Sequence, residues 1–570
     1  MRRVKTDILV LGAGGAGLFA ALHAKRRNPE LSVTIAVKGL LGKCGCTRMV
    51  QGGYNVALAP GDSVERHFMD TIEGGKWLPD QDLAWTLVTK AIERIHELEN
   101  ELGCFFDRNP DGTVHQKAFA GQTFDRTVHK GDLTGIEIIN RLAEQVWVSG
   151  VERLEEYRAV ELVMDAGGAI AGVVMIDMRE GDFVFVQAQS VLLGTGGGPT
   201  MYRFHTPSGD KSCDGLAMAL RAGLTLRDME MVQFHPTGLL AGPGTRMTGT
   251  VLEEGLRGAG GHLLNGASER FMERYDRRGE RATRDVVSRA IFAEMRAGRG
   301  TPNGGVYLSM AHLGPGTVRA QFKGMVERCD DCGFDLAGGL VEVVPTAHYM
   351  MGGVEFRADG ATAIRGLFAA GEDTGGVHGA NRLCGNGVAN STVFGAIAGD
   401  AMAEWTAREG EWREPAAGTL EVAEAAARRP VSQRGGGIEE IREALYGVMW
   451  DDVGILRDAN GLARARSRLA ELHARLMETG VSGTDLRYNL TWHDWLNLES
   501  LIEVSEAICT AATAREESRG AHFREDFPQT GDLAASAYSR IRRNAANLHE
   551  ASFEPVRFTR VRPGQSLVPA

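Results

Sequence analysis

The hydrophobic pattern of the chain predicts a parallel β-sheet that starts near its N-terminus. Asp7 to Leu11 (DILVL) is a short apolar run rich in branched residues, which is typical of a strand buried on both faces. A helical pattern follows from Leu18 to Arg27, and Ser32 to Val37 (SVTIAV) is a second apolar run. Two similar runs, Ser190 to Gly198 and Gly366 to Glu372, lie far along the chain and are rich in glycine at their ends. The domain that holds these strands is therefore expected to be discontinuous.

The pattern changes between and after these strands. Met231 to Pro345 contains mixed-charge helices of its own and is the natural place for an insertion. After Gly399, Ala, Glu and Arg recur at helical spacing, and a Gly/Pro/Arg-rich linker lies near Arg428 to Gly437. Helices are predicted from about Ile438 to Arg519, and the last residues are predicted to form a strand and a tail.

Composition and charge narrow the class of protein. Lys and Arg number 63 against 74 Asp and Glu, and the net charge of −11 argues against nucleic-acid binding. Glycine makes up 74 of the 570 residues, well above the usual share of about 7%, and its clustering suggests backbone held close to a ligand. No apolar run is long enough to span a membrane, and the short N-terminal apolar run passes into glycines that a strand-to-helix turn needs. A cytoplasmic location is therefore expected.

The eight cysteines do not form the pattern of a disulfide scaffold in so long a chain. They include two close pairs, Cys44 with Cys46 and Cys329 with Cys332. A zinc site made of all four thiolates is an alternative, but neither pair lies in a ribbon-like or knuckle-like context. We expect reduced, structural thiols and no metal.

A glycine fingerprint follows the first predicted strand. The run Gly12-Ala13-Gly14-Gly15-Ala16-Gly17 lies between that strand and the helix, as in dinucleotide-binding folds. The glycines allow a tight turn, and the helix N-terminus attracts a diphosphate. Lys38 and Gly39 stand where an acid for the ribose hydroxyls is usual, at the end of the second strand. Ribose recognition is therefore expected to differ from that of an ordinary NAD site.

Four further segments hold cationic or hydrogen-bonding side chains, mostly beside glycine or proline, where loops are fixed. They are His235-Pro236-Thr237, Thr283-Arg284-Asp285, His348 to Gly353, and His378 to Arg382. Two histidines and two arginines that converge would bind a doubly anionic substrate, because arginine binds carboxylate bidentately and histidine donates to it. Taken singly, each histidine is more often structural and each arginine more often a surface residue, and the sequence does not establish that they converge.

With these segments in this order, the chain resembles the flavoprotein subunits of succinate dehydrogenase and fumarate reductase, a superfamily that includes L-aspartate oxidase. The resemblance is carried by DMEMVQFHPTG (Asp228–Gly238), ATRDVVSRA (Ala282–Ala290), HYMMGG and GVHGANRLCGN (Gly376–Asn386). It continues in CTRMVQGGYNVAL, SCDGLAMALRAG, VMWDDVGILR and AREESRGAHFREDFP, and thus extends from Asp7 to about Pro528.

The resemblance implies an α/β fold with three domains and bound FAD. The expected parts are a Rossmann-like FAD-binding domain (1–230 and 346–405), an inserted α+β capping domain (231–345), a C-terminal helical domain (406–530) and a C-terminal strand and tail (531–570). The glycine fingerprint and the resemblance together assign cofactor binding to Gly12, Ala13, Gly14, Ala16, Gly17, Lys38, Cys46, Thr47, Gln51, Gly52, Gly53, Thr195, Gly196, Asp214, Glu372, Asn386 and Val388.

The resemblance also implies a set of catalytic residues between the cap and the flavin. His235, His348 and Arg382 would hold the substrate carboxylates. Arg284 would move the proton while flavin N5 exchanges hydride with the neighbouring carbon, and Glu254 and Arg257 match the family's proton path. Because free arginine hardly ever deprotonates, Arg284 can act only within a concerted relay. Asp285 either orients Arg284 or caps a helix.

Several positions depart from the family pattern. Cys46 aligns with the histidine that bonds covalently to FAD in respiratory complexes, so noncovalent FAD is expected, with a cysteinyl bond as the alternative. Losing the covalent link should favour alkene reduction or oxidase turnover. Glu253 replaces a threonine that helps to hold a carboxylate, and it would repel an anion unless protonated, turned away or bound to a modified substrate. Cys384 and Gly387 replace a glycine and a serine, which suggests a reshaped pocket.

The expected function is FAD-dependent interconversion of a C–C single and double bond in a succinate- or fumarate-like dicarboxylate. The chain lacks an iron–sulfur ligand pattern, so electrons are expected to pass through an iron–sulfur subunit or a soluble carrier, with any membrane association through partner subunits. One alternative is an oxidase like L-aspartate oxidase that makes an imine. Another is a catalytically silent flavoprotein in which Cys329 and Cys332 act as a redox switch.

Overall fold

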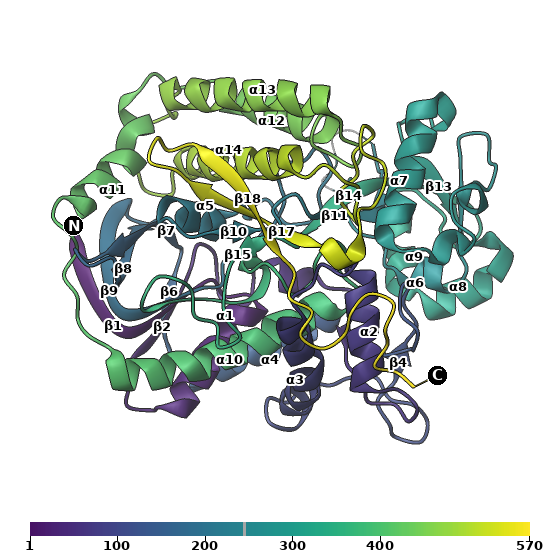
Figure 1. Ribbon diagram of the computed structural model, residues 1–570, viewed down its shortest axis with the longest axis horizontal. Helices are drawn as coiled ribbons and strands as arrows, with labels where there is room; N and C mark the ends of the chain where they lie inside the picture. Colours follow the sequence, from purple (N-terminus) through teal and green to yellow (C-terminus); the bar gives the residue numbers. More distant parts are fainter. Residues whose placement is uncertain (243–244, 246, 570) are drawn as a thin grey trace.

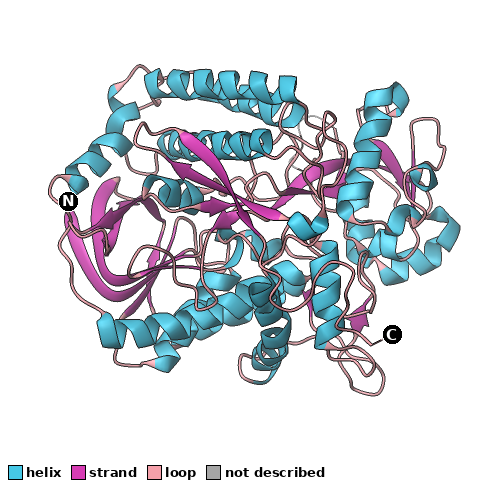
Figure 2. Cartoon of the chain, in the orientation of Figure 1, coloured by secondary structure: helices cyan, strands magenta, loops and turns pink. Residues whose placement is uncertain are grey.

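The computed structural model describes residues 1–242, 245 and 247–569, and its centre is a seven-stranded sheet (Figures 1 and 2). The strand order is β6-β2-β1-β9-β8-β7, and β16 also pairs with β9. The parallel strands are β1 (Arg2–Leu11), β2 (Val33–Val37), β6 (Glu152–Glu155), β9 (Asp182–Leu193) and β16 (Leu367–Ala369). β7 (Tyr157–Met164) and β8 (Ile170–Asp177) extend the sheet as antiparallel strands beside β9.

Both faces of this sheet are covered, which explains its continuous apolar runs. Ile8, Leu9, Val10 and Leu11 are at most 1% exposed. A layer formed by α1 (Gly15–Arg27), α3 (Gln81–Asn100), α4 (Thr134–Val148) and α10 (Asn386–Glu409) shares one hydrophobic core with these strands. The segment that leads to α4 also contains α2 (Val64–Gly74) and a small sheet of β3 (Tyr54–Asn55), β5 (Thr127–Val128) and β4 (Gln116–Lys117).

The C-terminal helices pack over the other side of the sheet (Figure 1). They are α11 (Thr419–Arg428), α12 (Ile438–Asp451), α13 (Ala459–Glu478) and α14 (Leu490–Ala514), and they share a core with α5 (Asp214–Arg221), β8 and β9. Trp492 of α14 lies 5.9 Å from Phe183 of β9, ring centre to ring centre. Sheet and helices are therefore joined by one continuous core.

An insertion carries its own sheet and lies at one end of the molecule, at the right of Figure 1. Its sheet has the order β11 (Val232–Leu239), β14 (Leu340–Met350), β13 (Val306–Ser309) and β12 (His262–Leu264). Its helices are α6 (Gly255–Gly258), α7 (Arg284–Glu294), α8 (Pro315–Gln321) and α9 (Lys323–Asp330). We call residues 231–345 the cap. Its two long strands, β11 and β14, connect it to the main sheet region, and β14 runs past the predicted end at residue 345.

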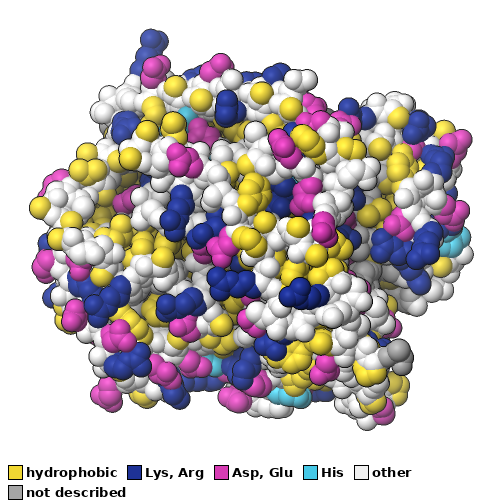
Figure 3. All heavy atoms as spheres, viewed as in Figure 1, with side chains coloured by type: hydrophobic (Ala, Val, Ile, Leu, Met, Phe, Trp, Pro, Cys, Tyr) yellow, Lys and Arg dark blue, Asp and Glu magenta, His cyan; other side chains and the backbone are white. Residues whose placement is uncertain are grey.

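The chain ends in a hairpin that pairs back onto the body of the protein. β17 (Ala537–Arg543) and β18 (His549–Pro555) form a four-stranded sheet with β10 (Leu226–Arg227) and β15 (Gly353–Val354). The α/β fold class and the helical C-terminal region are as predicted from the sequence. The face seen in Figure 3 mixes acidic and basic side chains. No helix in the described part of the chain is both long and apolar enough to cross a membrane.

Candidate active site

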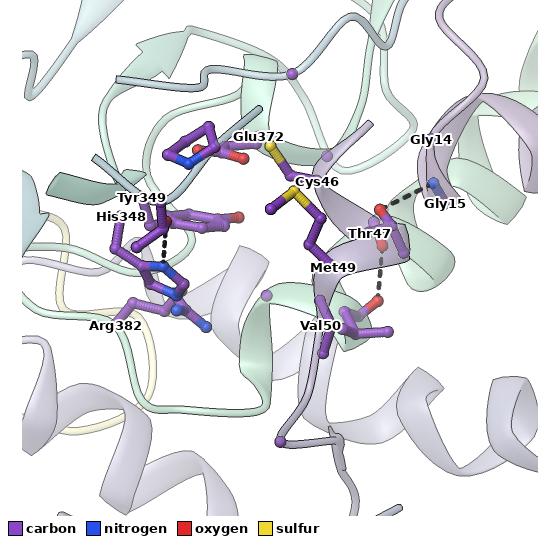
Figure 4. A pocket seen from close by; sticks show the side chains of 18 of the residues that line it. Gly14, Gly15, Cys46, Thr47, Met49, Val50, His348, Tyr349, Glu372 and Arg382 are labelled. Carbon is purple, nitrogen blue, oxygen red and sulfur yellow. Dashed lines mark hydrogen bonds between the residues drawn. The ribbon is translucent and has the colours of Figure 1, made fainter. Parts of the chain in front are cut away.

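The glycine-rich turn after β1 is tightly packed and opens the start of α1 to a cavity. Gly12 has a φ of +97°, and a Cβ there would lie 2.2 Å from the Gly194 carbonyl oxygen. A Cβ on Gly17 would lie 1.9 Å from the Gly12 carbonyl oxygen. Neither position has room for a side chain. The N–H of Gly15 donates to Oγ1 of Thr47 at 3.1 Å (Figure 4), so the N-terminal end of α1, with its positive potential, lies at the cavity wall.

Two adjoining cavities extend from this turn. With the solvent space at their mouths included, the larger measures about 1320 Å³ and the second about 600 Å³, and both are lined by Gly14, Thr195, Gly196 and Lys211. Among the predicted cofactor residues, the larger is lined by Gly14, Ala16, Cys46, Thr47, Gln51, Gly52, Gly53, Thr195, Gly196, Glu372 and Val388. The second is lined by Gly12, Ala13, Gly14, Lys38, Thr195, Gly196 and Asp214.

Two predicted cofactor residues line neither cavity. Gly17 packs inside the turn, and Asn386 lies at the start of α10. The Asn386 side chain accepts from Nδ2 of Asn55 at 2.9 Å and donates to Oγ1 of Thr71 at 3.1 Å. These two residues shape the site from behind its surface.

The missing acid at the end of β2 is supplied from elsewhere in the chain. Lys38 Nζ donates to Oδ2 of Asp214 and to Oγ of Ser212, each at 2.8 Å. Burial opposes ionisation of Asp214, but the Arg158 and Lys38 cations hold its pKa below the usual range. An ionised carboxylate therefore lines the second cavity although β2 itself ends in a lysine.

An elongated space beside an open helix N-terminus suits a dinucleotide such as FAD. The side-chain oxygen of Gln51 is buried at the larger cavity without a hydrogen-bond partner among the described residues, as is expected of a group that binds a ligand. Burial raises the pKa of Glu372 to about 7. Its Oε1 accepts the Met350 N–H at 3.0 Å.

A buried chain of charged side chains extends from the larger cavity into the cap. Arg284 begins α7 and donates from Nε to Oε2 of Glu254 at 2.7 Å. Arg257 donates to the other oxygen of Glu254 and, through Nη1, to the Glu280 carbonyl oxygen at 2.7 Å. Burial opposes ionisation of Glu254, but Arg257 and Arg284 hold its pKa well below the ordinary value. The three side chains form a continuous hydrogen-bonded path, of which Arg284 and Glu254 line the cavity and Arg257 does not.

Two neutral histidines and a second arginine line the same cavity. The rings of His235 on β11 and His348 on β14 are 5.4 Å apart. Burial, followed by the Arg284 charge, lowers the pKa of His235 to about 4, and the same causes lower that of His348 well below its ordinary value. Arg382 Nε is buried without a hydrogen-bond partner among the described residues, and His235 Nε2 has only a long contact, 3.5 Å, to Oε2 of Glu254. A bound carboxylate would supply closer acceptors.

Three of the four residues that depart from the family pattern, all except Cys46, have distinct surroundings. Oε2 of Glu253 lies 3.5 Å from Nζ of Lys117, so this carboxylate is turned toward a cation. Cys384 accepts a hydrogen bond from Nη2 of Arg284 at 3.1 Å through its sulfur. A Cβ on Gly387 would lie 2.9 Å from Nη1 of Arg382, so the glycine leaves room for the guanidinium.

The structure also brings in residues that the sequence did not single out. Gln233 accepts from Nη1 of Arg284 at 3.0 Å, and it lies two positions before His235 on the same face of β11. The Arg382 guanidinium stacks on the Tyr349 ring, with 4.4 Å between the guanidinium carbon and the ring centre (Figure 4). Strand periodicity could have found Gln233. Lys211 carried only a weak signal, its place directly before the SCDG motif.

Two residues of the predicted segments lie outside the cavity. His378 Nε2 is 3.4 Å from the Tyr349 hydroxyl. Asp285 pairs with Arg289 one turn later in α7, with 3.3 Å between Oδ2 and Nη2, and makes no hydrogen bond to Arg284 among those of the described residues. The structure therefore gives Asp285 no contact through which it would orient Arg284.

The cysteine pairs form no recognised metal site. All eight cysteines are free. Within the described ranges, no group of three or more His, Cys, Asp or Glu side chains is arranged to hold a metal ion.

Comparison with known proteins gives matches over nearly the whole chain. Residues 7–388 match the FAD binding domain family, and residues 442–567 match the fumarate reductase flavoprotein C-terminal family. A subunit of the CoM/CoB fumarate reductase of Methanothermobacter marburgensis is 41% identical, over 92% of this chain and 95% of that protein. The fumarate reductase flavoprotein subunit of Mycobacterium tuberculosis is 36% identical, over 98% of each chain.

The solved structures agree with the sequence comparison. A variant of FrdA from the Escherichia coli quinol fumarate reductase superposes with a TM-score of 0.94 at 33% identity, over 99% of each chain. A quinol–fumarate reductase with menaquinol molecules gives a TM-score of 0.91 at 32% identity, over 99% of this chain and 100% of that one. The chain thus belongs to the succinate dehydrogenase and fumarate reductase flavoprotein family, and it is an FAD-dependent oxidoreductase of that type.

Proposed function

We propose that this enzyme reduces fumarate to succinate, or runs the reverse reaction, with Arg284 as the residue that transfers the proton. The observation that carries this proposal is the buried path Arg284–Glu254–Arg257, which starts at the cavity that His235, His348 and Arg382 also line. Cationic and neutral donors surround a space that adjoins the glycine turn of the cofactor site. A dicarboxylate is the substrate class that these donors match.

Substrate binding would rest on donors that the described residues leave without a close partner. Arg382 has a buried Nε with no acceptor in that part of the chain, and its guanidinium stacks on the ring of Tyr349. His235 and His348 are neutral near pH 7 and donate without adding charge. Holding both carboxylates fixes the alkene carbons and stabilises the negative charge that develops between them.

Proton transfer would use the path through Glu254. Bound FAD supplies the hydride in the reducing direction. In one concerted step, Arg284 would donate a guanidinium proton to the neighbouring carbon while the ionised Glu254 takes up a proton from Arg257 and passes one to Arg284. Exchange with bulk water beyond the path would then replace the proton that Arg257 has given up. The concerted order matters because a lone neutral arginine is inaccessible near pH 7.

We propose that FAD is bound noncovalently. Cys46 lines the larger cavity, and burial raises the pKa of its thiol to about 12. The thiolate, which would form a bond to the flavin, is therefore rare near neutral pH. In the family a covalent histidine link favours succinate oxidation, and its absence here favours fumarate reduction.

The electron partner is proposed to be an iron–sulfur protein. Several relatives are named as subunits, and one is named 8-methylmenaquinol:fumarate reductase flavoprotein subunit. The present sequence has no cluster-binding cysteine pattern. Partners of this kind would also decide whether the chain is held at a membrane. Co-purification with a tagged chain, followed by iron and sulfide analysis, tests the proposed iron–sulfur partner. A chain that is active without binding an iron–sulfur protein would contradict this proposal.

The oxidase alternative finds less support in the geometry. To bind the ammonium group of an amino-acid substrate, the protein would need a free carboxylate at the cavity. Glu254 is hydrogen-bonded to two arginines and Glu253 is turned toward Lys117, so neither carboxylate is free for this role. The main test is the flavin spectrum during anaerobic addition of succinate and then of aspartate. Bleaching by succinate supports the proposal, and bleaching by aspartate alone overturns it in favour of an oxidase.

A further inference from the structure

Lys211 occupies the narrow junction between the two cavities. Four residues line both cavities, and among Gly14, Thr195, Gly196 and Lys211 only the lysine carries a charge. Gly14 is the N-cap of α1, whose N–H groups favour an anion. The junction thus combines a helix N-terminus with an ammonium group.

The position of Lys211 is built into the chain. A Cβ on Gly198 would lie 2.5 Å from Cβ of Lys211, so a side chain at Gly198 would displace the lysine. The side chain of Lys211 is 16% exposed, and its nearest carboxylate oxygen, on Asp210, is 4.0 Å away. Burial lowers the pKa of Lys211, but nearby acidic groups, Asp210 and Glu372 among them, outweigh it and leave the pKa above its ordinary value. Lys211 is therefore protonated near pH 7.

Lys211 differs from Lys38, which lines the second cavity, in how many of its ammonium N–H groups are hydrogen-bonded. Lys38 donates to Ser212, Asp214 and Asn497 at 2.8, 2.8 and 3.1 Å, which uses all three N–H groups. The ammonium group of Lys211 makes a single hydrogen bond among the described residues, to the Thr195 carbonyl oxygen at 3.2 Å. Two N–H groups of Lys211 are left for a ligand.

We propose that Lys211 binds the diphosphate of FAD and supplies the charge that holds a noncovalent cofactor. FAD has two nucleoside-like halves joined by a diphosphate, and the two cavities are joined where Lys211 and the start of α1 meet. A diphosphate at this junction would face both the Lys211 ammonium group and the N-terminal end of α1. Lys38 would stay paired with Asp214 beside the second cavity. The inference rests on FAD binding and is independent of the proposed substrate and proton path.

The direct test compares FAD with riboflavin on deflavinated protein. Lys211→Gln is expected to weaken FAD binding about 10- to 100-fold, the range for losing a charge-assisted hydrogen bond, and to leave riboflavin affinity within about twofold. Lys211→Arg should restore most of the FAD affinity, and exposed Lys43→Gln should match the wild type. Unchanged FAD affinity, or equal losses for FAD and riboflavin, would overturn the proposal.

A second measurement on the unmodified sequence covers the case in which Lys211→Gln does not fold. Acetylation followed by mass spectrometry should label Lys211 after deflavination and spare it in the FAD-bound protein. Lys43 should react in both forms. Equal labelling of Lys211 with and without FAD would overturn the proposal. Both experiments read cofactor binding, so a failure of the fumarate reaction leaves their outcome unaffected.

Discussion

Three side chains constrain the guanidinium of Arg284. Glu254, Gln233 and Cys384 each contact a different nitrogen, at 2.7, 3.0 and 3.1 Å. We expect Arg284→Gln to lower turnover by at least about 10³-fold, because the proton donor is lost, while FAD content and substrate-induced spectral shifts persist. Exposed Arg278→Gln on the same cap is the control. Normal turnover of Arg284→Gln in stopped-flow assays would refute the relay.

The residues proposed to hold the substrate carboxylates (His235, His348 and Arg382, the carboxylate clamp) should respond to mutation differently from the proton relay of Arg284, Glu254 and Arg257. Arg382→Ala removes a guanidinium that binds a substrate carboxylate, so this variant should have a higher KM and a lower kcat. The expected fall in kcat/KM is about 100-fold or more. Steady-state kinetics against fumarate, with Arg284→Gln in parallel, would separate the two roles. Unchanged KM and kcat would remove Arg382 from the carboxylate clamp.

Glu253 and Lys117 form a pair that a double-mutant cycle can measure. With Lys117→Gln, the carboxylate of Glu253 loses the cation 3.5 Å away and leaves uncompensated negative charge at the cavity wall. We expect KM for the dicarboxylate to rise about tenfold, and Lys117→Gln/Glu253→Gln to return it close to the wild-type value. A double variant no better than Lys117→Gln would show that the charge of Glu253 is not felt by the substrate.

At the residue scale, sequence reasoning found side chains that belong to motifs and missed those that act through geometry. His235, Arg284, His348 and Arg382 are placed by motifs, and the structure brings all four to one cavity. Lys211 was missed because its role depends on the meeting of two cavities, which local sequence does not encode. The carboxylate at Asp214 compensates for Lys38 through a contact across more than 170 positions, and only the fold reveals it.

At the element scale, the strand–turn–helix unit was predictable because its constraints are local. β1 and α1 extend further than the predicted runs, but the glycine turn between them is where the sequence placed it. Of the β7–β8–β9 meander, only the end of β9, from Ser190 on, was predicted. β8 and nearly all of β9 are buried, so they lack the polar alternation that identifies antiparallel strands. The pairing of β17 with β10 depends on contacts between distant segments, which periodicity cannot supply.

The glycine turn allows packing and cofactor roles to be separated by two substitutions. A methyl group on Gly17 would meet the Gly12 carbonyl at 1.9 Å, so Gly17→Ala should fold poorly or aggregate. A methyl group on Gly14 would meet only Thr47, at 3.6 Å, so Gly14→Ala should fold but bind FAD at least about tenfold more weakly. Circular dichroism and FAD titration distinguish the outcomes. Wild-type FAD affinity in Gly14→Ala would exclude a close approach of the cofactor at that glycine.

At the scale of the whole molecule, the site exists only because distant segments converge. The cavity walls come from the β1–α1 turn, from β11 and β14 at the base of the cap, and from the start of α10. The sequence pattern could predict the strands, helices and motifs and their order along the chain. It could not predict how the cap packs against the rest of the protein, because those contacts follow no helical or strand periodicity. The packing of these segments against one another also buries many ionisable groups. The unfolding temperature of the whole protein should therefore depend on pH.

The unfolding temperature is expected to fall as pH decreases from about 7 to 5. Burial lowers the pKa of His67 to about 3 and of His129 to about 4, and it acts in the same direction on five more buried histidines. Between these values and about 6.5, the unfolded chain binds more protons than the folded one, so stability rises with pH. Glu372 and Asp228 oppose this trend, because burial raises their pKa values to about 7 and about 6.

His23 and His473 act on the side of these two acids, because neighbouring carboxylates raise their pKa values, but the seven buried histidines outnumber these four groups. We therefore expect the unfolding temperature to fall by several degrees between pH 7 and 5. Calorimetry of the FAD-bound protein at constant ionic strength measures the shift. His67→Gln should flatten the profile, because burial holds the pKa of His67 at about 3, far below its unfolded value, and its ring lies outside the substrate cavity. Exposed His96→Gln is the matched control and should leave the slope unchanged. A melting temperature that stays constant or rises on acidification would mean that Glu372 and Asp228 dominate, and that the buried histidines are accessible to protons in the folded state.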